Sequence, residues 1–182
     1  MIKNSIQELV NIDVRTRQNL LELGFLSLGC WRNILDRGLP KEPLLKNQGV
    51  YTILRNDPTN PVFYKPVEVQ RIGNVIKPLS ICLLQTRWVT GVPVLYFGAA
   101  GIRSNRTLRQ RLNDMRRHCL GETTRNGPHR GGEMLWQVQG YKEFELMIMR
   151  TGEHPLPRAW ECALNNRFLV LCGKLPFANC QS

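Results

Sequence analysis

The chain has 182 residues, of which 42% are hydrophobic and 21% are charged. This balance excludes a disordered chain, which would hold fewer apolar residues, and the length favours a single domain. Lysine and arginine number 25 against 14 acidic residues, and the resulting formal charge of +11 favours a polyanionic partner, with nucleic acid first. The chain contains no apolar run near the roughly 18 residues of a membrane span. Residues 1–8 show no apolar signal core, so we expect a cytoplasmic protein without a membrane partner.

Residues 1–45 are predicted to form an N-terminal helical arm. Apolar residues between positions 6 and 23 recur at roughly helical spacing, and Gly24 is suited to end the first helix. A shorter helix is expected over 31–37, followed by a glycine and two prolines that predict a connection. The remaining residues, 46–182, are predicted to form the functional domain.

Strand and helix patterns mix within residues 46–182. Segments rich in apolar, β-branched or aromatic residues are predicted strands: 49–54, 93–98, 133–139 and 143–150. Segments with apolar residues at helical spacing are predicted helices: 105–119 and 155–172. The order shows no regular βαβ alternation, which predicts an α/β (α+β) fold with a small mixed or antiparallel sheet and helices packed on it. Residues 56–93 form an insert between the first two strands.

Two predicted helices place polar residues at the border of an apolar stripe. On helix 105–119, Arg111 and His118 lie together at one edge of the stripe, and on helix 155–172 Glu161 lies at such an edge. Packing would hold these side chains while they reach a cleft. Phosphodiester hydrolysis uses such groups, because a carboxylate can hold a divalent metal and a guanidinium can stabilise phosphate charge. The alternative is that they are solvated rim residues in ion pairs.

Five motifs resemble, in order, those of the GIY-YIG nuclease family. Gly49-Val50-Tyr51 and Leu95-Tyr96-Phe97-Gly98 resemble the two motifs that name the family. Three later segments resemble its arginine helix, its glutamate helix and its closing segment with an asparagine: 107–112, 158–161 and 175–179. The stretch 129–137 also resembles a subgroup of short stand-alone bacterial members. The ordered set is specific, although each motif alone is weak.

The resemblance implies a three-stranded antiparallel sheet flanked by helices and a mechanism with one metal ion. Glu161 would bind Mg²⁺ or Mn²⁺, and Arg111 would clamp the scissile phosphate. Tyr51 would act as the general base or position the water, with Tyr96 beside it. A phenol needs nearby positive charge for this role, because its ordinary pKa is near 10. Asn179 would hold local structure. The alternative for the tyrosines is cross-strand packing with hydrated hydroxyls.

Two positions depart from the family pattern. Ala99 stands where many members carry a lysine, and Met115 stands where many carry histidine or tyrosine. A nearby arginine would then lower the tyrosine pKa in place of the lysine; the candidates are Arg103, Arg106 and Arg109. His118 is a candidate replacement at the second position, although a basic residue also suits a helix end. His129, in a glycine-rich loop, is a candidate for phosphate contact or proton transfer.

Basic residues cluster between positions 103 and 130. Those predicted to contact nucleic acid are Arg103, Arg106, Arg109, Arg116, Arg117, Arg125 and Arg130, beside Arg111. Such a patch contacts phosphates and makes binding depend on salt, but it carries no sequence specificity.

The sequence therefore predicts an endonuclease that hydrolyses DNA with Mg²⁺ or Mn²⁺, of restriction or phage-defence type. A structure-specific repair nuclease or a ribonuclease is an alternative within the same class. The other alternative is a catalytically degenerate module that binds nucleic acid, which Ala99 and Met115 favour. DNA is the expected partner and RNA the alternative; the insert is expected to contact DNA or a second copy of the chain in a homodimer.

Overall fold

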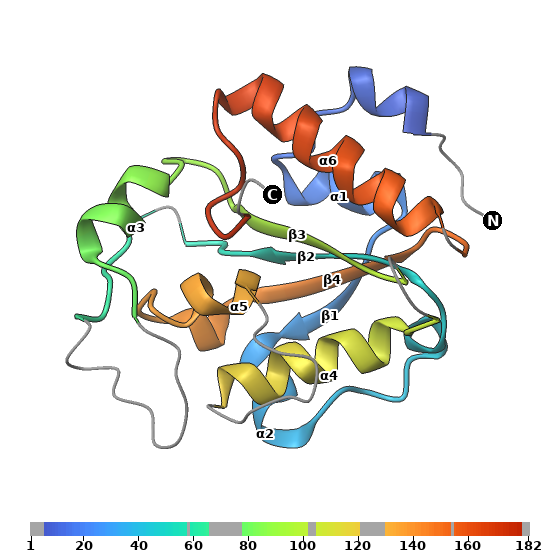
Figure 1. The fold of residues 1–182 in the computed structure, drawn as a ribbon, viewed down its shortest axis with the longest axis horizontal. Helices are drawn as coiled ribbons and strands as arrows, with labels where there is room; N and C mark the ends of the chain where they lie inside the picture. The colour runs from blue at the N-terminus through green and yellow to red at the C-terminus, as the bar shows by residue number, and fades with distance from the viewer. Residues whose placement is uncertain are drawn as a thin grey trace.

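A computed structural model of the chain places helices on both faces of one β-sheet (Figure 1). The residues that it describes are 6–57, 59–65, 78–101, 105–120, 130–153 and 155–179. The strands are β1 (Leu26–Cys30), β2 (Gly49–Leu54), β3 (Val94–Ala100) and β4 (Glu145–Arg150). The α-helices are α1 (Arg17–Leu23), α2 (Trp31–Arg37), α3 (Ile81–Arg87), α4 (Leu108–Cys119), α5 (Arg130–Leu135) and α6 (Leu156–Cys172). Short 3-10 helices span Ile6–Asn11, Pro43–Lys46 and Tyr141–Glu143.

Neighbouring strands of the sheet run antiparallel in the order β1-β4-β2-β3. The fold is therefore mixed α+β with an antiparallel sheet, but the sheet has four strands and not the three that the resemblance implies. Strand β2 lies between β4 and β3 and is buried along its whole length. Because successive side chains of a strand point to opposite faces, Tyr51 and Ile53 face one helix layer, and Val50 and Leu54 face the other.

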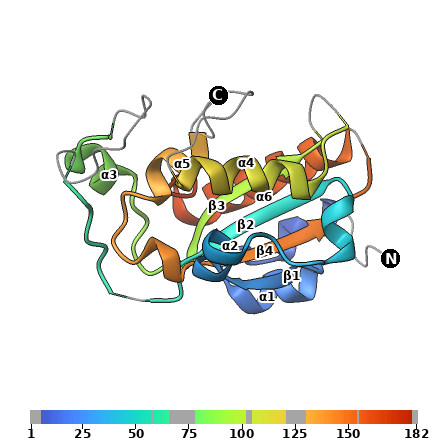
Figure 2. The ribbon, with the colours of Figure 1, turned by 90° about the horizontal axis from the view of Figure 1, so that it is seen from below.

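The two helix layers bury separate apolar clusters. Trp31 of α2, Leu112 of α4 and Leu135 of α5 pack on the first face, and Leu20 of α1 and Phe168 of α6 pack on the second. Figure 2 shows α2 and α4 in front of the strands when the molecule is seen from below. Helices α4 and α6 each contact β3, the edge strand. A side chain from either helix can therefore reach that edge.

Strand β1 lies inside the segment that the sequence predicts as a helical arm. Helices α1 and α2 form as expected and end at Gly24 and Gly38, but residues 26–30 between them pair with β4. A bulge between Ser27 and Gly29 interrupts the pairing. Residues 26–30 are too few for an alternating apolar pattern to indicate a strand. The pairing with β4 therefore determines the structure of this segment.

A second correction concerns residues 133–139, which the sequence predicts as a strand. Residues 130–135 belong to helix α5, and Val138 makes one isolated antiparallel bridge with Phe63. Consecutive apolar residues of this stretch are buried, whereas a strand with one buried face would bury every second residue. A short apolar run of that kind fits a buried helix as well as a strand, so the pattern alone does not distinguish the two.

The predicted insert, residues 56–93, contains helix α3, which begins after Ser80. Positions 58 and 66–77 of the insert lie outside the described residues. Within the part of the chain that the structure covers, we find no helix with the length and apolar character needed to cross a membrane.

Glu145 at the start of β4 ties the N-terminal elements to the sheet. Its carboxylate accepts hydrogen bonds from Arg17 of α1 at 2.8 Å, Ser27 of β1 at 2.6 Å and Asn56 after β2 at 3.1 Å. Burial alone would raise the pKa of Glu145, but these three hydrogen bonds outweigh it and hold the pKa below its ordinary value. The carboxylate is thus a charged junction between four segments of the chain.

Glu145→Gln is expected to lower the free energy of unfolding at pH 7 by about 2 kcal/mol, because it removes charge-assisted hydrogen bonds from a buried acceptor. Since the folded pKa lies below the ordinary value of 4.5, this stabilisation is complete above that pH and is lost as the pH falls through the folded pKa. Urea unfolding at pH 7 and at successively lower pH measures the difference. Glu143→Gln, which removes an exposed pair with Arg32, is the control and should change stability less.

Candidate active site

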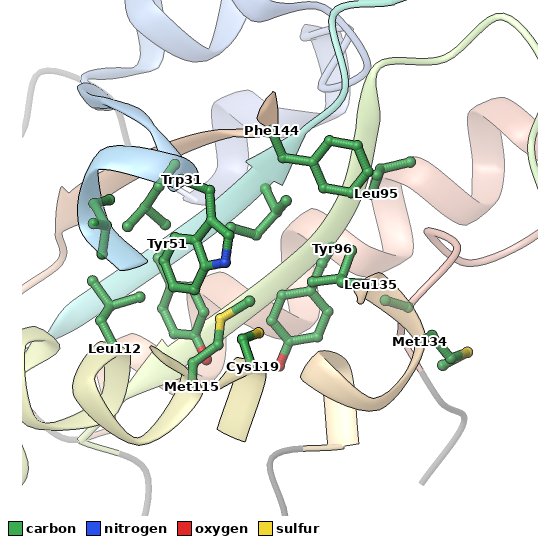
Figure 3. Packing of buried hydrophobic residues seen from close by; sticks show 14 of the residues in the cluster. Trp31, Tyr51, Leu95, Tyr96, Leu112, Met115, Cys119, Met134, Leu135 and Phe144 are labelled. Atoms are coloured by element: carbon green, nitrogen blue, oxygen red, sulfur yellow. The ribbon is translucent and has the colours of Figure 1, made fainter. Parts of the chain in front are cut away.

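Tyr51 and Tyr96 stand side by side on the sheet face that α4 covers (Figure 3). In the register of β2 and β3, Tyr51 pairs with Gly98 and Ile53 pairs with Tyr96, so the tyrosines are diagonal neighbours on one face. Their ring centroids are 5.8 Å apart, with 50° between the ring planes. Both rings are buried, and the two hydroxyl groups share a hydrogen bond.

Three glycines allow the close approach of the tyrosines and of the strands. A Cβ atom at Gly98 would lie 2.5 Å from Cζ of Tyr51 and 2.7 Å from Cε1 of Tyr96. At Gly131 of α5, a Cβ would lie 2.3 Å from Cε2 of Tyr96, and at Gly49 it would lie 2.1 Å from a backbone oxygen of β4. These contacts are shorter than any side chain tolerates. The glycines are therefore required by the close approach of the tyrosines and of the strands.

Helix α4 presents Arg111 to the tyrosine pair. The helix begins after Thr107, which forms a reciprocal capping box with Gln110. Leu112 is fully buried on the sheet face, and Arg111 lies beside it, half-buried, where its positive charge acts on both tyrosines. The position at the border of the apolar stripe agrees with the helical periodicity. The neighbouring tyrosines raise the pKa of Arg111, so its positive charge is permanent.

The two phenols differ in how readily they ionise. Burial raises the pKa of Tyr51 above its ordinary value, while the charge of Arg111 and the hydrogen bond with Tyr96 lower it. Burial raises the pKa of Tyr96 well above its ordinary value, and negative charge on Tyr51 and Glu161 adds to this rise. Both phenols are therefore neutral at neutral pH, and the charge of Arg111 favours the ionised form of Tyr51.

Glu161 reaches the same region from the second turn of α6. Trp160 and Leu164 of this helix pack into the second apolar cluster and fix its orientation, while Glu161 itself is 8% exposed. Arg158 donates a hydrogen bond from Nη1 to Oε2 of Glu161 at 3.0 Å. Burial raises the pKa of the Glu161 carboxyl above its ordinary value, although Arg158 and Arg111 both act to lower it. The two arginines therefore do not fully offset the cost of burying the charged Glu161 carboxylate.

The structure brings together four residues that the sequence singles out. Tyr51, Tyr96, Arg111 and Glu161 come from β2, β3, α4 and α6, and the charge of each of the last two changes the pKa of both tyrosines. Sheet pairing joins the tyrosines, and the helices on opposite faces supply the arginine and the glutamate at the β3 edge. The cluster therefore combines a permanent cation, a buried carboxylate and two hydroxyl groups.

The fit of a divalent metal depends on Glu161. Among the residues that the structure covers, no group of three histidine, cysteine, aspartate or glutamate side chains could hold a metal ion. Mg²⁺ does not need such a group, because it keeps several waters and binds through one or two carboxylates together with substrate phosphates. A buried carboxylate with a raised pKa gains from a nearby cation. A single buried carboxylate such as Glu161 is therefore compatible with Mg²⁺ or Mn²⁺, which would bind there together with waters and substrate phosphates.

Asn179 lies against the free edge of β3. Its Oδ1 accepts a hydrogen bond from the Phe97 N–H at 2.9 Å, and its Nδ2 donates to the Phe97 carbonyl at 2.8 Å. The backbone N–H of Ala178 donates to the Leu95 carbonyl at 2.9 Å. The closing segment therefore satisfies the edge beside Tyr96 as a further strand would. This geometry suits the structural role that the resemblance implies for Asn179.

The positions that depart from the family pattern lie in the core. Ala99 faces the second apolar cluster, on the sheet side opposite to the tyrosines, and Met115 is buried in the first (Figure 3). The cation that lowers the Tyr51 pKa is Arg111 itself. His118 is buried where α4 meets α5, about 10 Å along the helix axis from Arg111. His129 lies outside the described residues.

Several arginines predicted to bind nucleic acid have partners inside the protein. Arg106 pairs with Asp114, Arg109 donates to the Leu39 and Pro40 carbonyls, and Arg116 donates to the Ile34 and Leu35 carbonyls. Arg116 therefore binds carbonyls in the last turns of α2, an interaction that stabilises the end of a helix. Arg117 is half-buried. Arg103, Arg125 and the Arg130 side chain lie outside the described part of the chain.

Arg158 is the site residue that sequence reasoning passed over. It stands three positions before Glu161, the spacing at which two side chains on a helix are neighbours. The spacing predicts this contact, because an arginine three positions before Glu161 lies near its carboxylate if the segment is helical.

Comparisons of the chain with protein-family models, with curated proteins and with solved structures found no match. The function is therefore argued from the geometry of the site and from the motifs.

Proposed function

We propose that the protein is a divalent-metal-dependent endonuclease of GIY-YIG type that hydrolyses phosphodiester bonds in DNA. The observation that carries the proposal is the cluster of Tyr51, Tyr96, Arg111 and Glu161, in which the tyrosine rings are 5.8 Å apart and the arginine and the glutamate both act on them. Each of these residues comes from a different element, so local packing alone does not account for their meeting. A formal charge of +11 supports a polyanionic substrate.

Each group has a distinct role in this proposal. The metal, when bound, supplies charge that stabilises the phosphate and the leaving oxygen. Glu161 holds it, and Arg111 donates to the phosphate oxygens, where negative charge builds up in the transition state. Tyr51 would position the attacking water and, in its ionised phenolate form, accept the proton of that water, since the charge of Arg111 favours this form. Tyr96 supports this by its hydrogen bond to Tyr51, which lowers the Tyr51 pKa.

The environment of Ala99 bears on the alternative of a degenerate binding module. The absence of a lysine at this position favours the module, because a lysine there would lower the tyrosine pKa. Ala99 packs against the α6 layer, whereas the charge of Arg111 already lowers the pKa of Tyr51. The chain therefore keeps a cation at the tyrosine without the lysine, which supports the enzyme over the module.

A substrate panel tests the proposal. Purified protein is incubated with supercoiled plasmid, branched DNA and single-stranded RNA, each with Mg²⁺, with Mn²⁺ or with EDTA. We expect metal-dependent cutting of duplex DNA, and sequencing of the ends should give a defined site if the enzyme is of restriction type. Cutting confined to branched DNA or to RNA would identify a repair nuclease or a ribonuclease. Salt-sensitive DNA binding with no cleavage of any substrate would contradict the proposal and favour the binding module.

A further inference from the structure

Arg158 lies one turn before Glu161 on α6 and has no role in the hydrolysis proposed above. Its Nη1 is 3.0 Å from Oε2 of Glu161. The partners differ in exposure, because the Arg158 side chain is 48% exposed and the Glu161 side chain 11%. A guanidinium that is half in solvent loses little hydration in the pair and can leave it easily. The buried carboxylate cannot follow it into water.

Arg111, the other cation that acts on Glu161, is held differently. It is half-buried on α4, and its charge acts on Tyr51, which is fully buried in the sheet. Arg158 is more exposed than Arg111, so it can leave the site with a smaller loss of packing contacts than Arg111 can. Of these two cations, Arg158 is therefore the one that can be exchanged.

We infer that Arg158 is an exchangeable counter-ion that holds Oε2 of Glu161 in the metal-free protein and gives way when a divalent cation binds there. The inference rests on the proposed function, in which Glu161 is the metal ligand. The ion pair keeps the Glu161 carboxylate oriented before the metal arrives. Since guanidinium and metal compete for one oxygen, the pair also weakens metal binding.

Mn²⁺ binding to the protein without nucleic acid tests the inference, with free Mn²⁺ measured by electron paramagnetic resonance. Arg158→Ala is expected to bind Mn²⁺ about tenfold more tightly than the wild type, the change in affinity that one charge-assisted hydrogen bond confers. Arg158→Met, which keeps the aliphatic stem on the helix, should behave in the same way. Arg158→Lys should return to the wild-type affinity, because an ammonium group restores the pair. Arg37→Ala on α2, an exposed site on the opposite layer, removes equal charge and should change nothing.

Mn²⁺ binding by the alanine and methionine variants that is no tighter than in the wild type would overturn the inference. Glu161→Gln separates this result from failure of the proposed function. If Glu161→Gln abolishes Mn²⁺ binding while the Arg158 variants leave it unchanged, the metal site stands and the role of Arg158 is wrong. If Glu161→Gln binds Mn²⁺ as the wild type does, the metal site and the counter-ion are both wrong.

Discussion

Arg111→Gln should lower kcat for DNA cleavage about 1,000-fold, with a much smaller change in KM. A preorganised donor that meets charge developing on a phosphate contributes this much to a rate. The substitution also removes the cation that opposes the effect of burial on Tyr51, so the pKa of Tyr51 rises further. The cleavage rate should therefore fall. The pH range in which the rate increases as Tyr51 ionises should also move to higher pH. Steady-state cleavage of a short duplex, measured across pH, gives both quantities.

Arg109→Gln is the matched control for Arg111→Gln. Arg109 lies two residues earlier on α4 and donates to the Leu39 and Pro40 carbonyls, away from the tyrosines. The control removes the same charge from the same helix, so it is expected to keep kcat near the wild-type value. Equal losses of kcat in both variants would show that general charge, and not the position of Arg111, governs the rate.

Gly98→Ala should lower kcat about 100-fold, because displacement of reacting groups by about 1 Å has an effect of this size. The added Cβ would lie 2.5 Å from Cζ and 2.6 Å from the hydroxyl oxygen of Tyr51, and 2.7 Å from the ring of Tyr96. The rings must therefore move apart. The same overpacking should lower the free energy of unfolding by about 1–3 kcal/mol. Cleavage kinetics and urea unfolding of one preparation measure the two effects together.

Leu20→Ala distinguishes loss of geometry from loss of stability. Leu20 of α1 is fully buried in the cluster on the other sheet face, so its truncation should cost about 2–5 kcal/mol without moving the tyrosines. At a temperature where both variants are folded, Leu20→Ala should keep the wild-type kcat and Gly98→Ala should not. If Gly98→Ala also kept it, the tyrosine geometry would not matter for the reaction.

Local signals account for the elements that the sequence predicts correctly. Gly24 and Gly173 end α1 and α6 in left-handed conformations, and the β-branched and aromatic residues of 49–54 form β2 over those residues. Strand β1 and helix α5 were missed because distant contacts decide them. Strand β1 depends on pairing with β4 and on Glu145, more than 100 residues away in the sequence.

The sequence singles out the residues of the candidate site but not the partners of the other arginines. The motif positions identify Tyr51, Tyr96, Arg111 and Glu161, and helical periodicity alone places the last two at the edge of an apolar stripe. The partners of the other arginines lie far along the chain. The carbonyls that bind Arg116 are about 80 residues away, so the charge pattern alone could not separate this structural contact from a phosphate contact.

We propose that Glu161 and the tyrosine pair form a metal-dependent hydrolytic site. The most direct test compares wild type and Glu161→Gln in plasmid cleavage with Mg²⁺ and with Mn²⁺. Because burial raises the pKa of Glu161, a neutral side chain is no harder to bury there, and the variant should fold. We expect cleavage by the wild type that EDTA stops, and a loss of at least about 1,000-fold in the folded variant. Undiminished cleavage by Glu161→Gln would contradict the claim.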